Sequence, residues 1–203
     1  MRFFTIPSLA ARIYPEALFR IRTREKILCL TFDDGPDPES TPELLEILER
    51  HNVRSIFFCD GRAAETYPGL VGMIRDRGHI VGNHGYNHLN GWSTSAGEYC
   101  RDVKRASGFT SASLFRPPYG LLRYNQYLRL KTSFRIVFWD VMPYDFDREF
   151  PPARSLEILN RRIRPGSVIV LHDRQDSTSV LFLDEFLETS AGKGWEFRCP
   201  DLQ

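Results

Sequence analysis

Short apolar runs alternate with helical segments along most of this 203-residue chain. Runs rich in Val, Ile, Leu and Phe are typical of buried strands, and strands joined in sequence by helices favour a parallel sheet. The strand-like runs lie near residues 27–32, 53–59, 79–82, 113–116, 135–139, 167–172 and 195–198. The helical segments lie at 42–51, 68–77, 95–106, 155–164 and 179–189. We therefore predict an α/β domain with about seven parallel strands.

Residue types that favour helix ends support this alternation. Pro42 suits the first turn of a helix, and Gly78 suits the position just after one. Ser95, with Glu98 three residues later, predicts a capping box at the start of another helix.

Two adjacent carboxylates, Asp33 and Asp34, end the first apolar run and are followed by a Gly-Pro pair. Such a sequence alone is typical of a turn after a strand. Further along, His84 and His88 stand in a segment rich in Gly and Asn, which disfavours a regular helix. One Asp and two His supply the ligand set of a catalytic divalent-metal site, with positions left open for water and substrate. The second Asp is then free to act as a base.

Three more segments carry chemically suggestive residues. Residues 116–120, Arg-Pro-Pro-Tyr-Gly, combine an Arg with two prolines that fix the backbone, as a rigid loop beside a carboxylate requires. Residues 139–146 follow an apolar run, and His172 ends the β-branched run at 168–172. Taken singly, the first segment could be an ordinary surface turn, and the histidine is as compatible with a structural role as with a catalytic one.

Taken in order, these five segments resemble the polysaccharide deacetylase family, also called the NodB homology domain or carbohydrate esterase family 4. The resemblance extends over roughly residues 27–173. It implies a distorted, partly open (β/α) barrel over residues 27–203, with chemistry at the carboxyl ends of the strands. It also implies a metal-dependent hydrolase that removes N-acetyl groups from an amino sugar in a glycan or glycoconjugate.

The resemblance further implies a metal site and a pocket for the acetyl group. Asp34, His84 and His88 would hold one divalent ion, with zinc expected first and cobalt, nickel and manganese as alternatives. Phe146 and Leu171 would form the apolar wall of the pocket.

Five positions receive catalytic roles from the same resemblance. Asp33 would take the proton of the attacking water, and Arg116 would orient Asp33. The backbone N–H of Tyr119 would help bind the oxyanion and the substrate. His172 would protonate the departing amine, and Asp145 would orient His172 and raise its proton affinity.

The chain departs from the family pattern at three positions. Gly85 stands where many relatives carry Ser or Thr, so a hydroxyl that braces the loop is missing. The fourth motif commonly reads Asp-x-x-Asp-Trp, and here Met142 and Phe146 replace its first and last residues. Asp145 is retained, so we expect catalysis to persist, while substrate choice stays open.

Two other classes of function are compatible with parts of the pattern. Non-haem iron oxygenases also use two His and one carboxylate, but we would expect an all-β double sheet for them. A catalytically inactive metal- and carbohydrate-binding module of the same fold is the closer alternative. Such a module would be expected to lack Asp33 or His172, and both are present.

The composition limits the classes of binding partner and the expected location of the protein. The formal net charge is +1, which indicates no polyanionic partner and disfavours nucleic acid. No apolar run approaches the length of a membrane span, and no signal peptide is recognisable, so we expect a cytoplasmic protein. Residues 1–26 interleave apolar and basic side chains; we expect them to pack on the domain, with an anionic membrane surface as the alternative. The oligomeric state is left open.

Overall fold

The computed structural model describes residues 10–111 and 113–199, and within them seven parallel strands form one sheet. The order is β5-β4-β3-β2-β1-β6, and β7 pairs with the start of β1. The strands are β1 Ile27–Asp33, β2 Ile56–Cys59, β3 Ile80–Asn83, β4 Leu114–Phe115, β5 Arg135–Ile136, β6 Val168–His172 and β7 Glu196–Phe197. The predicted parallel α/β sheet is confirmed, although β4, β5 and β7 are shorter than the apolar runs around them.

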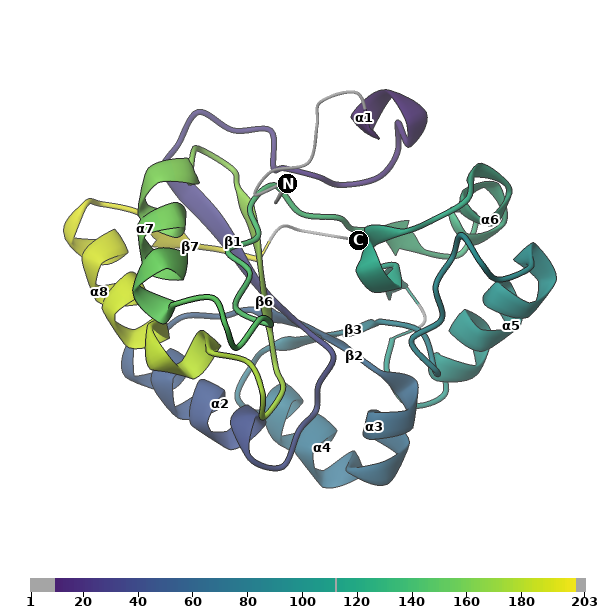
Figure 1. Ribbon diagram of the computed structural model, residues 1–203, viewed down its shortest axis with the longest axis horizontal. Helices are drawn as coiled ribbons and strands as arrows, with labels where there is room; N and C mark the ends of the chain where they lie inside the picture. Colours follow the sequence, from purple (N-terminus) through teal and green to yellow (C-terminus); the bar gives the residue numbers. More distant parts are fainter. Residues whose placement is uncertain (1–9, 112, 200–203) are drawn as a thin grey trace.

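Helices form an arc around the outside of the curled sheet, so the domain is an open half-barrel (Figure 1). The arc comprises α2 Ser40–Arg50, α3 Gly61–Thr66, α4 Pro68–Asp76, α5 Ala96–Ala106, α6 Tyr124–Leu130, α7 Pro152–Arg162 and α8 Leu183–Gly192, while α1 Ala10–Ile13 lies apart from it in the segment before β1. Half of the predicted capping box of α5 is present, since Ser95 Oγ accepts a hydrogen bond from the Glu98 N–H. No helix among the described residues combines the length and apolar character needed to cross a lipid bilayer.

Alternate residues of β1 face opposite sides of the sheet, which explains how one strand serves both the core and the site. Leu28, Leu30 and Phe32 pack into the main apolar core with residues of α2 and α8. Cys29 points the other way, into a second cluster inside the half-barrel. Asp33 continues this inward series at the carboxyl end of the strand.

The gap between the edge strands β5 and β6 is bridged by chain segments rather than by a further strand. Leu18 pairs with Val137 just after β5, and Arg20 pairs with Ser167 just before β6. Gly166 is required here, because its φ is +79° and a Cβ atom would lie 2.0 Å from the Ile21 carbonyl oxygen. Residues 10–26 therefore lie across the opening of the half-barrel (Figure 1), and residues 1–9 of the predicted extension fall outside the described part.

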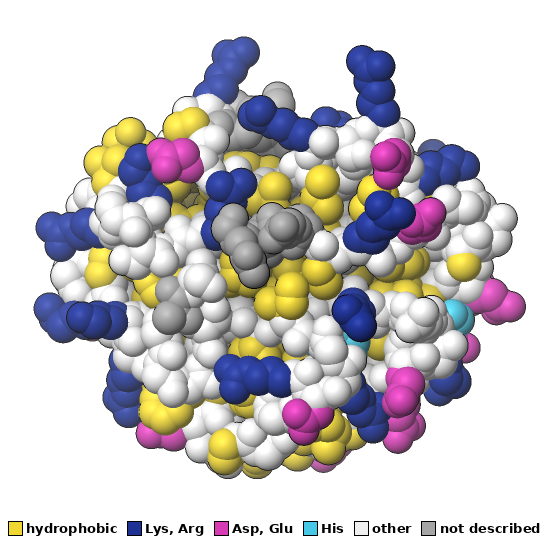
Figure 2. All heavy atoms as spheres, turned by 180° about the vertical axis from the view of Figure 1, so that it is seen from behind, with side chains coloured by type: hydrophobic (Ala, Val, Ile, Leu, Met, Phe, Trp, Pro, Cys, Tyr) yellow, Lys and Arg dark blue, Asp and Glu magenta, His cyan; other side chains and the backbone are white. Residues whose placement is uncertain are grey.

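The charged surface is mixed. On the face opposite to the view of Figure 1, Lys and Arg side chains are spread over the rim and the middle, with Asp and Glu side chains among them (Figure 2). Charges of both signs therefore occur on this face.

Candidate functional site

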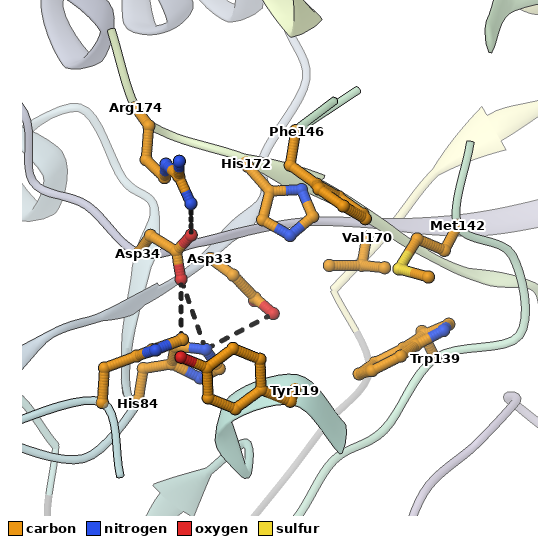
Figure 3. A pocket seen from close by; sticks show the side chains of 11 residues that line it. Asp33, Asp34, His84, Tyr119, Trp139, Met142, Phe146, Val170, His172 and Arg174 are labelled. Atoms are coloured by element: carbon orange, nitrogen blue, oxygen red, sulfur yellow. Dashed lines mark hydrogen bonds and ion pairs between the residues drawn. The ribbon is translucent and has the colours of Figure 1, made fainter. Parts of the chain in front are cut away.

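The predicted site residues meet at the carboxyl ends of the strands. Asp33 and His172 are paired in register at the ends of β1 and β6, while His84 follows β3 and Arg116 follows β4. A cavity of about 230 Å³ opens between them (Figure 3). It is lined by Asp33, Asp34, His84, His88, Tyr119, Trp139, Met142, Phe146, Val170, His172 and Arg174.

Asp34, His84 and His88 form one compact cluster. Asp34 Oδ1 lies 3.5 Å from His84 Nε2 and 3.3 Å from His88 Nε2. One ligand atom from each of the three residues lies within 4.8 Å of the other two. A carboxylate oxygen and two imidazole nitrogens are a donor set that suits a divalent transition metal.

The protonation of this cluster favours cation binding. His84 Nδ1 lies 2.9 Å from the Arg116 carbonyl oxygen, which can only accept, so Nδ1 carries the hydrogen and Nε2 presents its lone pair. Burial lowers the pKa of His84 to about 4, which keeps the ring neutral. Burial alone would raise the pKa of Asp34, but the hydrogen bond from His88 and the positive charge of His172 hold it well below its usual range.

The loop between the two histidines is held by a buried carboxylate from α5. Asp102 accepts hydrogen bonds from the N–H of Tyr86 at 2.7 Å and from the Nδ2 of Asn87 at 2.6 Å. The backbone N–H of Asn87 adds longer contacts of 3.2 Å. Gly85 has a φ of +82°, where any side chain would be strained. The loop is therefore braced by Asp102, so the lack of a hydroxyl at position 85 does not leave it unsupported.

Asp102→Ala should lower the free energy of unfolding by about 1–3 kcal/mol, because the buried N–H of Tyr86 and the partly buried N–H groups of Asn87 lose their acceptor. Urea denaturation of the metal-free protein measures this change. Asn87→Ala, which removes only one of the bonds to Asp102, should cost about 0.5–1.5 kcal/mol. Wild-type stability in Asp102→Ala would show that the loop does not depend on this carboxylate.

Asp33 is paired with a completely buried arginine. Arg116 is 0% exposed, and its Nη1 donates to Asp33 Oδ1 at 2.7 Å. Its Nε and Nη2 donate to the carbonyl oxygens of Val137 and Phe138 at 3.2 and 2.9 Å. The guanidinium is fixed on three sides and therefore fixes the orientation of the Asp33 carboxylate.

His172 is held by Asp145 in the predicted manner. Asp145 Oδ1 lies 3.1 Å from His172 Nδ1, and Asp145 Oδ2 accepts hydrogen bonds from the His172 N–H at 2.7 Å and from Ser177 Oγ at 2.9 Å. Burial by itself would lower the pKa of His172, but the Asp145 carboxylate outweighs it and raises this pKa to about 9. The imidazole is thus arranged to carry a proton facing the cavity.

The three residues predicted to contact the substrate are placed differently from one another. Tyr119 is 59% exposed and lies with its ring edge-on to His88, and Phe146 packs edge-on against His172. Leu171, however, is fully buried in the main core, so the prediction that it forms the pocket wall is wrong. Alternate residues of β6 face opposite sides, and Val170 lines the cavity instead.

Several lining residues were not predicted from the sequence. Trp139 packs beside Gly120, and Val170 lies one residue before the predicted Leu171. Arg174 contacts Asp34 from the far side of the cavity. Strand alternation could have identified Val170 from His172, two residues later, whereas the contact of Arg174 depends on how the loop after β6 folds.

Comparison with known proteins agrees with the fold and identifies the family. The family model for polysaccharide deacetylase matches residues 20–134. A peptidoglycan-N-acetylglucosamine deacetylase of Bacillus cereus is 36% identical over 182 residues, which are 84% of this chain and 65% of that protein. A chitooligosaccharide deacetylase of Azorhizobium caulinodans is 36% identical over 167 residues, covering 76% of this chain and 77% of the relative.

A solved structure shows the same architecture. The Bc1960 peptidoglycan N-acetylglucosamine deacetylase, crystallised with an aromatic hydroxamate, superposes with a TM-score of 0.88 at 30% sequence identity, covering 95% of this chain and 94% of that one. The chain belongs to the polysaccharide deacetylase family. The parallel sheet also argues against the all-β fold expected for an iron oxygenase.

Proposed function

We propose that this protein is a metal-dependent deacetylase that hydrolyses the N-acetyl group of an amino sugar in a glycan or glycoconjugate. The observation that carries the proposal is the arrangement across one cavity of a carboxylate fixed by Arg116, a metal-ligand cluster and a histidine that favours its protonated form. N-acetylglucosamine-containing glycans are the first substrates to test, because the matched relatives are named for peptidoglycan N-acetylglucosamine and chitooligosaccharide.

Asp34, His84 and His88 would hold the metal ion, with zinc as the first candidate and cobalt, nickel or manganese as alternatives. When bound, such an ion lowers the pKa of a water molecule and polarises a carbonyl oxygen. The neutral, oriented imidazole of His84 supports this assignment, since a protonated imidazole cannot bind a metal.

The remaining residues would transfer the protons and stabilise the oxyanion. Asp33, held by Arg116, accepts the proton of the water that attacks the acetyl carbon. The backbone N–H of Tyr119 donates to the developing oxyanion; Gly120 and Leu121 donate the bonds that close the turn containing this residue. His172 donates a proton to the departing nitrogen, and Asp145 stabilises the charged imidazole that precedes this step.

A carbohydrate-binding module without activity is the alternative. It requires no base and no acid, so nothing would maintain the buried Arg116–Asp33 pair or the His172–Asp145 pair beside the metal cluster. The presence of both pairs at one cavity supports the hydrolase.

The proposal predicts acetate release from N-acetylated chitooligosaccharides or peptidoglycan fragments that is abolished by a chelator and restored by zinc or cobalt. His88→Ala should no longer retain stoichiometric metal, because one of three protein ligands is gone. His51→Ala is a matched control, since His51 pairs with Asp184 outside the cavity and should keep both metal and activity. If the wild-type protein carries no divalent ion, and added zinc or cobalt changes neither stability nor acetate release, the proposal is wrong.

A further inference from the structure

Arg174 contacts a predicted metal ligand from the side opposite to the histidines. Its Nη1 donates to Asp34 Oδ2 at 3.3 Å, whereas Asp34 Oδ1 faces His84 (Figure 3). The same Oδ1 atom also faces His88 Nε2. The two oxygens of one carboxylate therefore have different partners. One oxygen is directed into the imidazole cluster, and the other is directed at a guanidinium.

The position of Arg174 is itself fixed by a neighbouring acid. Its Nε and Nη2 donate to the two carboxylate oxygens of Asp176 at 2.8 and 2.6 Å, a pair of parallel hydrogen bonds that sets the plane of the guanidinium. This leaves Nη1 aimed at Asp34. The side chain is 40% exposed and lines the cavity, so it is not part of the apolar core and its replacement need not unfold the protein.

This arrangement would weaken the binding of a cation at the cluster in two ways. A carboxylate can bind a cation through one oxygen or through both, and the use of Asp34 Oδ2 would require the Arg174 contact to break. In addition, the fixed positive charge repels a cation and lowers the affinity of the site. A cation held by fewer oxygens is less neutralised and keeps a coordination position for water or substrate.

We propose that Arg174, oriented by Asp176, is a positioning residue that restricts Asp34 to metal binding through Oδ1. Arg174 thereby lowers the affinity of the site for the metal and raises kcat. The inference rests on the proposed function, because it assumes that the cluster holds a catalytic ion. It predicts opposite changes in two measured quantities, which a residue that merely supports the fold would not produce.

The test is Arg174→Met, which keeps the length of the apolar stem and removes the charge. Isothermal titration of the metal-free protein should show zinc binding about tenfold tighter. Acetate release by the zinc-saturated variant should show kcat lower by about 10- to 100-fold, with a smaller change in KM. Arg174→Lys, which keeps the charge but replaces the planar guanidinium with a single ammonium group, should show weaker zinc binding than Arg174→Met. Asp176→Asn should reduce kcat less strongly than Arg174→Met.

Arg154→Met is the matched control, because Arg154 lies on α7 and pairs with Glu157 outside the cavity. It should leave zinc affinity and kcat unchanged. The inference is overturned if Arg174→Met binds zinc equally or less tightly than wild type, or if it binds zinc more tightly but keeps wild-type kcat. Failure of the proposed function would appear differently, as a wild-type protein that neither binds zinc nor releases acetate.

Discussion

Replacing Asp33 with Asn should lower kcat for N-acetyl hydrolysis by about 10²–10⁴-fold while zinc binding persists. An amide cannot take a proton from the attacking water, so the base is lost. Asp33 is not one of the three residues of the metal-ligand cluster, so the ion should still bind. The measurement is acetate release per bound zinc, with zinc content determined on the same sample.

Asp33 also pairs with the buried Arg116, so its replacement can reduce the amount of folded, zinc-loaded protein. The rate is therefore expressed per bound zinc. The Asn carbonyl can still accept from this guanidinium, so the variant should fold, although with reduced stability. Asp34→Asn is the contrasting variant and should lose zinc together with activity. Near-normal acetate release by Asp33→Asn would assign the base to another group.

The sequence predicted the fold well where local pattern and tertiary structure agree. β1, β2 and β6 overlap apolar runs of the kind expected for buried strands of a parallel sheet, and Ser95 Oγ caps its helix as expected. α2 begins at Ser40, before the predicted start, because Asp37 Oδ1 accepts hydrogen bonds from the N–H groups of Glu39 and Ser40. The pairing of Leu18 with Val137 had no local signal, since it depends on the gap left between β5 and β6.

The site was predictable to the extent that its residues occur in recognisable motifs. The structure brings Asp33, Asp34, His84, His88 and His172 to one cavity, as their positions at strand ends suggested. Which side chains support them was not predictable. Asp102 reaches the histidine loop only because α5 packs beside it, and Arg174 reaches Asp34 only because Asp176 orients it. The contacts of Asp102 with the histidine loop and of Arg174 with Asp34 join segments from different parts of the chain, and their spacing in the sequence does not predict them.

Replacing His172 with Ala should reduce kcat for N-acetyl amides by about 10²–10⁴-fold but should affect activated esters far less. The amide nitrogen is a poor leaving group without a proton, whereas an activated ester departs unprotonated. The comparison uses the ratio of kcat/KM for the two substrates with one enzyme preparation. A general loss of folded protein lowers both values equally and leaves the ratio unchanged.

Asp145→Asn tests the role of His172 as the general acid, because this change should lower the pKa of His172. The Asp145 carboxylate raises the pKa of His172 to about 9 in the metal-free protein, against the effect of burial. A general acid acts in its protonated form, so a lower pKa should move the alkaline limb of the rate profile for amides to lower pH. The ester rate should lack this shift, because no proton is needed by its leaving group. Equal losses on amide and ester after His172→Ala, with no shift of the limb in Asp145→Asn, would instead show that His172 is structural and that another group protonates the amine.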